Sequence, residues 1–198
     1  TQRWTAMALY NLTQKATGQG LDALVEYIIA QKGVQSLLFL VYSDNPEVSS
    51  YAMSTIAVLS KAVAPVFPGP GENPSHAPAR RALFMAGVMW CVHKLWRDGN
   101  FDMQLAIAVI VCNLGSNQEN LMDMMSGSDE LLEILFYFIA LCSDPVRVEQ
   151  AAVARKDGNL LSSISKVQAA MEMKLSCVVL LGKILSFEEY HARFLSLG

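Results

Sequence analysis

The sequence is poor in charged residues, and what charge it has is balanced. Asp, Glu, Lys and Arg make up only 17% of the 198 residues, whereas hydrophobic residues make up 53%. The formal net charge is −3, and no stretch concentrates Lys and Arg. Proteins that bind nucleic acids usually carry a basic patch or stripe. The sequence therefore does not predict nucleic acid as a partner.

Long hydrophobic runs are also absent. The longest, such as Leu105–Cys112 (LAIAVIVC), stop after eight to ten residues, whereas a helix that spans a bilayer needs about 20. We therefore expect no integral membrane span. No basic region followed by an apolar region opens the chain, so no secretory signal is predicted. Thr1 lies inside an expected helix, which suggests a piece excised from a longer protein.

The four cysteines lack the spacing of a zinc site or a small disulfide framework. Each lies in an apolar run: Cys91, Cys112, Cys142 and Cys177. We interpret them as reduced thiols in the core of an intracellular, cytoplasmic protein.

No constellation of catalytic residues is found either. His93 lies in an apolar stretch without an acidic residue one helical turn away, and it is more simply a partly buried polar side chain. Cys91 and His93 cannot form a dyad on a helix, because residues two apart point about 200° apart. The segment FPGPGEN lacks the Lys and Ser or Thr of a phosphate loop. We therefore predict no enzyme, no cofactor and no metal site.

What the sequence does contain is helical periodicity, and strand-like alternation is hard to find. In the stretch DNPEVSSYAMSTIAVLS, apolar residues recur on one helical face. Asp44 or Asn45 can cap this helix, Pro46 suits its first turn, and Glu47 favours its N-terminal end.

One order of elements recurs along the chain: a short helix, a glycine bend, an apolar second helix and a long third helix. The bend glycine and the closing leucine of the third helix are 26 residues apart in Gly33–Leu59 and 27 in Gly87–Leu114. The spacing is 58 in Gly127–Leu185, which indicates an insert of about thirty residues. Such internal repetition is the signature of repeat proteins.

These observations predict a single repeat domain over residues 1–198. Its expected parts are a partial repeat 1–16, a repeat 21–61, a loop insert 64–79, a repeat 80–115, a repeat 118–186 with an insert at about 145–170, and a partial repeat 187–198. The first insert is rich in proline and reads as a loop. Its Pro65-Val-Phe-Pro68 is formally a PxxP core, although a plain connection is the preferred interpretation. Within the second insert, 145–156 is expected to be an extra or broken helix and 171–186 the true third helix.

The stretch EYIIAQKGVQSLLFLVYSDNPEVSSYAMSTIAVLSK resembles an armadillo repeat, and AVIVCNLGSN and ALYNLT resemble the Ala-rich, Asn-Leu end of that family's third helix. HEAT-type repeats are the second choice. The resemblance implies an all-α fold, a right-handed superhelix (solenoid) of stacked three-helix repeats whose third helices line a concave groove.

If the repeats superpose, ten side chains face that groove. They are Trp4, Met7, Asn11, Tyr51, Ser54, Val58, Val109, Asn113, Leu180 and Ile184. Nuclear-import members of the family carry Trp and Asn one turn apart there, for an extended basic peptide. Asn11 and Asn113 match that pattern, but Met7 and Val109 stand at the Trp positions, so cargo import is not predicted. Each Asn could equally cap its own helix.

The expected function is that of a non-catalytic scaffold or adaptor. It would bind an extended or amphipathic helical segment of another protein along its concave face. The groove is nearly uncharged, so an alternative for its apolar side chains is coverage by neighbouring helices. The competing function is a structural one, in which the end segments 1–16 or 187–198 self-associate or stack on further repeats.

Overall fold

The computed structural model describes residues 2–16, 19–61, 77–97, 100–126, 129–144, 146, 148 and 160–196. Within these ranges the fold is all-α, and every regular element is a helix. The chain divides into two compact units, Thr1–Asn120 and Leu121–Gly198. The predictions for 64–76 of the loop insert and for most of 145–156 lie outside the described residues. Residues 77–79, predicted as the end of that loop, instead form the start of the helix Ala77–Met85.

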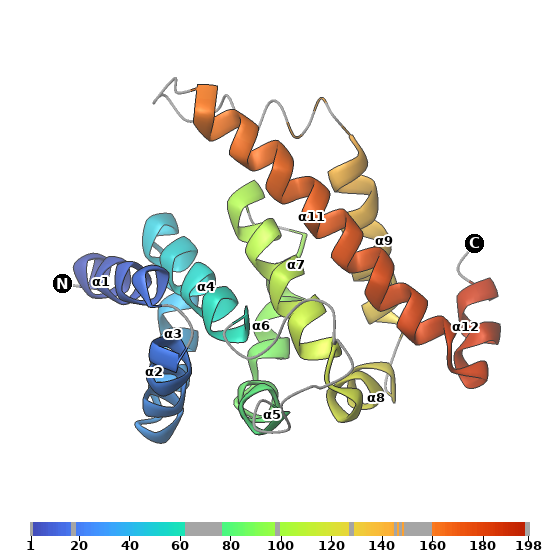
Figure 1. Ribbon diagram of the computed structural model, residues 1–198, viewed down its shortest axis with the longest axis horizontal. Helices are drawn as coiled ribbons and strands as arrows, with labels where there is room; N and C mark the ends of the chain where they lie inside the picture. Colours follow the sequence, from blue (N-terminus) through green and yellow to red (C-terminus); the bar gives the residue numbers. More distant parts are fainter. Residues whose placement is uncertain are drawn as a thin grey trace. The chain divides into compact units, whose positions relative to one another are not determined.

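Unit 1 contains seven described helices and the start of an eighth (Figure 1). They are α1 (Gln2–Lys15), α2 (Gln19–Ala30), α3 (Gly33–Val41), α4 (Pro46–Lys61), α5 (Ala77–Met85), α6 (Val88–Leu95), α7 (Phe101–Gly115) and α8 (Gln118–Ser126), which continues into unit 2. The order of short, second and long helix is therefore present twice in unit 1, as α2–α3–α4 and α5–α6–α7.

The long helices of unit 1 pack side by side. Helix α4 packs against α1 on one side and against α7 on the other, and it also packs on α3. Figure 1 shows α1, α4 and α7 as successive neighbours. The buried residues of α4 include Ala52, Met53, Ile56 and Leu59, so this helix forms the centre of the core.

Unit 2 contains the rest of α8, then α9 (Glu130–Ser143), α11 (Leu160–Leu185), the short 3₁₀ helix η2 (Glu188–Tyr190) and α12 (His191–Ser196). Its core lies between α9 and α11, which form the largest helix contact of this unit. Helix α11 runs without a break from Leu160, so the expected start of a third helix at 171 does not coincide with a helix end.

The two bends in front of the second helices have different causes. At Gly87 the backbone has φ 91, the left-handed region that glycine adopts without strain. At the first bend the positive φ of 55 belongs to Lys32, and Gly33 is already the first residue of α3. A Cβ on Gly33 would lie 3.0 Å from the side chain of Ile28 and 3.1 Å from its carbonyl oxygen. Gly33 is therefore needed for close packing and not for the turn itself.

Side-chain caps fix the starts of two long helices. The Asn45 side-chain oxygen accepts hydrogen bonds from the backbone N–H groups of Glu47 (3.0 Å) and Val48 (3.4 Å), and Asn100 accepts one from Met103 (2.9 Å). These bonds satisfy N–H groups that have no partner within the helix. Of the two caps expected for α4, Asn45 is the one that forms.

Asn120 connects the end of α7 to α5. Its buried amide donates to the carbonyl oxygens of Leu114 (3.2 Å) and Arg80 (3.3 Å), and its side-chain oxygen accepts from Arg81 (3.2 Å). Buried polar groups are retained where they are fully bonded, so this amide fixes how α5 meets α7.

Among the described helices, none alone has both the length and the apolar composition to cross a bilayer. One pair, Ala23–Ala30 with Gly33–Val41, reaches these values only together, and its two parts are bent by 84°.

Candidate partner-binding surface

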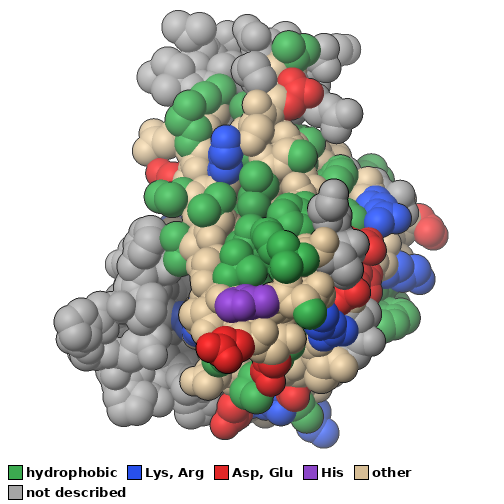
Figure 2. Space-filling model, turned by 90° about the vertical axis from the view of Figure 1, so that its right-hand side faces the viewer, with side chains coloured by type: hydrophobic (Ala, Val, Ile, Leu, Met, Phe, Trp, Pro, Cys, Tyr) green, Lys and Arg blue, Asp and Glu red, His purple; other side chains and the backbone are tan. Residues whose placement is uncertain are grey.

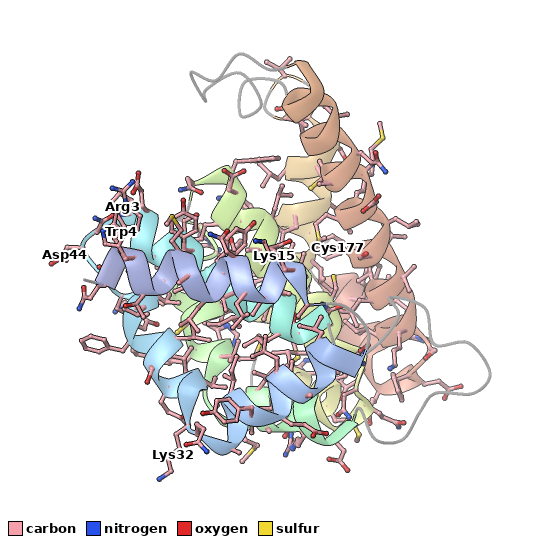
Figure 3. The ribbon with its side chains drawn as sticks, turned by 60° about the vertical axis from the view of Figure 1, so that its left-hand side comes forward. Arg3, Trp4, Lys15, Lys32, Asp44 and Cys177 are labelled. Carbon is pink, nitrogen blue, oxygen red and sulfur yellow. The ribbon has the colours of Figure 1, made fainter. Side chains whose placement is uncertain are left out.

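Helix α1 presents three of the side chains expected in the groove. Trp4 is 65% exposed, Asn11 is exposed and Met7 is half-buried. The opposite side of the helix is buried through Ala6 and Thr13. Figure 3 shows Arg3 and Trp4 on the first turn of α1 and Lys15 on its last. This helix therefore offers polar and apolar groups to a partner.

Helix α4 presents the next three, Tyr51, Ser54 and Val58, and all are half-buried. Their spacing places them on one face of the helix. Two contacts connect α4 to α1. The ring centroids of Tyr10 and Tyr51 lie 5.6 Å apart, and the Arg3 guanidinium forms an ion pair with the Glu47 carboxylate at 2.5 Å. We call the surface formed by Met7, Tyr10, Asn11, Tyr51, Ser54 and Val58 the α1–α4 face.

The two groove residues expected on α7 are not available to a partner. Val109 is 8% exposed and Asn113 is 5% exposed. The Asn113 amide nitrogen donates to the hydroxyl oxygen of Ser60 at 3.1 Å, which links α7 to α4 inside unit 1. Asn113 is thus neither a groove residue nor a helix cap. The physical reason is that α7 is buried on nearly every side, so its apolar pattern does not mark an open face.

The two groove residues expected on α11, Leu180 and Ile184, are also buried. With Ala170 and Cys177 they form the side of α11 that is covered within the fold, while Met171 and Leu175 are exposed. For this helix the expectation chose the wrong side. Both sides are apolar, and periodicity alone does not distinguish the covered one.

An exposed aromatic cluster on α3 and α6 was not expected from the sequence. The rings of Tyr42 and Trp90 lie 5.3 Å apart, and the Lys94 ammonium lies 5.0 Å and 5.3 Å from their centres. Trp90 and Phe39 are 62% and 71% exposed. The sequence carried no signal for this cluster, because Trp90 lies in the uninterrupted apolar run 88–92. The structure buries Val88, Met89, Cys91 and Val92 of α6 and leaves Trp90 exposed.

The thiols and hydroxyls near this cluster are not activated. Burial raises the pKa of the Cys91 thiol, against opposing effects of Tyr42 and Lys94. Burial, with a smaller contribution from Cys91, also raises the pKa of the Tyr42 hydroxyl. In unit 2, burial and the neighbouring Cys177 raise the pKa of Cys142 to about 11. A thiol nucleophile needs the opposite shift.

No group of three or more metal-ligating side chains occurs in the part of the chain that the structure describes. His93 is half-buried on α6, and His191 lies at the start of α12 with its Nε2 2.7 Å from the carbonyl oxygen of Leu185. The candidate site is therefore the exposed surface of the described helices.

Comparison with known proteins adds no relative: no protein-family model, curated protein or solved structure matches this chain.

Proposed function

We propose that this chain is a non-catalytic protein-interaction scaffold built of armadillo-type repeats, and that it binds a segment of another protein on the α1–α4 face. The observation that carries the proposal is the environment of α4. This helix packs between α1 and α7, yet Tyr51, Ser54 and Val58 stay half-exposed along one side. A row of long helices with one open side is a surface that an extended or helical segment can follow.

The chemistry of the α1–α4 face indicates the kind of partner. Exposed Asn11 can donate to and accept from a peptide backbone, and the Tyr10–Tyr51 ring pair offers a flat apolar contact with polar tips. Within this face Ser54 and Val58 add no charge, while Arg3 and Glu47 at its edge already pair with each other. An uncharged or weakly charged segment with alternating apolar side chains therefore fits best.

Photo-crosslinking from position 51 in a cell extract, followed by purification of the crosslinked protein, identifies the partner. Its affinity is then compared for the unmodified chain, Ser54→Arg and the matched control Ser36→Arg, which lies at an exposed position of α3. We expect Ser54→Arg to weaken binding at least tenfold with an unchanged helical spectrum, and Ser36→Arg to bind normally. Normal binding by Ser54→Arg, or equal loss by both variants, would exclude the α1–α4 face.

A structural role is the second candidate, in which the end segments 1–16 or 187–198 self-associate or stack on further repeats. The exposed side chains of Trp4, Leu12 and Leu195 in these segments support it.

A further inference from the structure

The exposed aromatic cluster connects α3 and α6 within unit 1. Tyr42 directly follows α3, Trp90 lies on α6, and the two helices pack against each other. The ring centroids lie 5.3 Å apart, with an angle of 56° between the ring planes. The hydroxyl oxygen of Tyr42 is buried beside Cys91, whereas Trp90 is 62% exposed. The cluster therefore combines one anchored ring with one open ring.

Lys94 lies over both rings. Its ammonium nitrogen is 5.0 Å from the ring centroid of Tyr42 and 5.3 Å from that of Trp90. Both distances are within the roughly 6 Å of a cation–π contact. A long lysine side chain loses rotamer freedom when a partner orders it. Because the two rings already hold this one, a partner that binds the ammonium meets a preorganised group.

The ammonium of Lys94 has hydrogen-bond donors left for a partner. A lysine ammonium carries three N–H donors. Arg3 and Arg81 also lie over aromatic rings, and each of them forms an ion pair with a glutamate. Among the described residues, no carboxylate pairs with Lys94. At this cluster, unlike at the two arginines, the described chain supplies a cation and two rings but no anion.

The cation over the rings separates this cluster from a plain apolar patch. Figure 2, which views the side where α11 and α12 lie in Figure 1, shows hydrophobic side chains gathered in a patch bordered by charged ones. A patch of that kind does not specify what binds it. The cluster on α3 and α6 does, because its ammonium favours a negative charge on the partner and disfavours a positive one.

We propose that this cluster is a second binding site, for a peptide segment that carries an aspartate or glutamate next to an apolar side chain. The carboxylate pairs with Lys94, and the apolar side chain packs on the open ring of Trp90. Tryptophans often dominate the energy of interfaces, whereas an exposed ion pair alone adds little. Trp90 therefore supplies affinity, and Lys94 selects the partner. The site goes beyond the proposed function and uses other helices than the α1–α4 face.

The low density of positive charge on α6 favours a peptide over an anionic membrane. Binding to anionic lipid headgroups uses clusters of roughly four to eight Lys or Arg residues. Within residues 88–97, the exposed basic side chains are Lys94 and Arg97. Such a small positive charge matches the one or two carboxylates of a short segment.

Selection from a displayed library of random peptides tests the site. The full unmodified chain is the bait, and an excess of soluble Trp90→Ser chain removes the peptides that bind elsewhere. We expect the remaining peptides to share an aspartate or glutamate beside an apolar residue. Titration calorimetry then measures their affinity for the unmodified chain and for each variant.

Lys94→Glu should weaken binding of the selected peptides about tenfold. Exchange of the acidic residue of the peptide for lysine should restore the affinity for this variant. Trp4→Ser is the matched control, because Trp4 is 65% exposed and lies under Arg3, which is already paired with a carboxylate. It should bind the peptides normally. Trp90 and Lys94 are both exposed, so the helical spectrum should not change in their variants.

Three results would overturn the proposal: no peptide whose binding depends on Trp90, selected peptides that lack an acidic residue, or equal affinity of Lys94→Glu and the unmodified chain. None of them bears on partner binding by Ser54→Arg, so the two proposals fail separately.

Discussion

At the scale of single residues, the buried amide of Asn113 couples two long helices of unit 1. It donates to Ser60, whose own hydroxyl donates to the carbonyl oxygen of Ala57 at 2.8 Å. Because both side chains are buried, removal of either leaves a polar group without its partner. The residue therefore acts on stability, and its expected role in partner binding is not compatible with its position.

Asn113→Ala should lower the free energy of unfolding by about 1–2 kcal/mol, because a buried hydrogen bond is lost. A double-mutant cycle with Ser60→Ala should give a coupling energy of about 0.5–1.5 kcal/mol. Urea unfolding followed by circular dichroism measures both quantities. Unchanged stability of Asn113→Ala would contradict the burial of this amide.

Lys32 and Gly33 should respond oppositely to substitution. Lys32→Gly should raise the free energy of unfolding by about 0.5 kcal/mol, because relief of the left-handed backbone outweighs the added chain entropy. Gly33→Ala should lower it by about 1–3 kcal/mol, because the new Cβ meets Ile28. Thermal melting of the two variants measures the difference. If Lys32→Gly lowered the free energy of unfolding and Gly33→Ala raised it, the account of this bend would be wrong.

At the scale of elements, α11 offers a direct test of an open helix side. Gly182→Ala should raise the free energy of unfolding by about 0.5–1 kcal/mol, because alanine is the better helix former and its Cβ meets nothing. Gly87→Ala is the matched control: its Cβ also meets nothing, but the positive φ should make the change destabilising. Destabilisation by Gly182→Ala would mean that this side of α11 is covered.

The helices themselves could be predicted from the sequence, and the side that each one exposes could not. The start of α4 could be predicted from its capping residues, and Asn45 forms the predicted cap. The bend at Gly87 could be predicted from the glycine itself. The buried positions of Val109 and Ile184 could not be predicted. Apolar residues surround α7 and occupy two sides of α11, and hydrophobic periodicity identifies a covered side only where the other side is polar.

At the scale of the whole molecule, both compact helical units expose apolar or aromatic side chains among their described residues. Unit 1 holds the α1–α4 face and the aromatic cluster of Phe39, Tyr42 and Trp90, and unit 2 exposes Met171 and Leu175 on α11. Exposed apolar surface of this extent is a common sign of interaction sites. The placement of the partner on one of these surfaces is the central claim about function.

Hydrogen exchange of the chain with and without its purified crosslinked partner tests that claim most directly. Partner binding should slow amide exchange in α1 (Gln2–Lys15) and α4 (Pro46–Lys61) and leave α3 and α6 unchanged. Slowed exchange in α3 and α6, with none in α1 and α4, would place the partner on the aromatic cluster and contradict the proposed function.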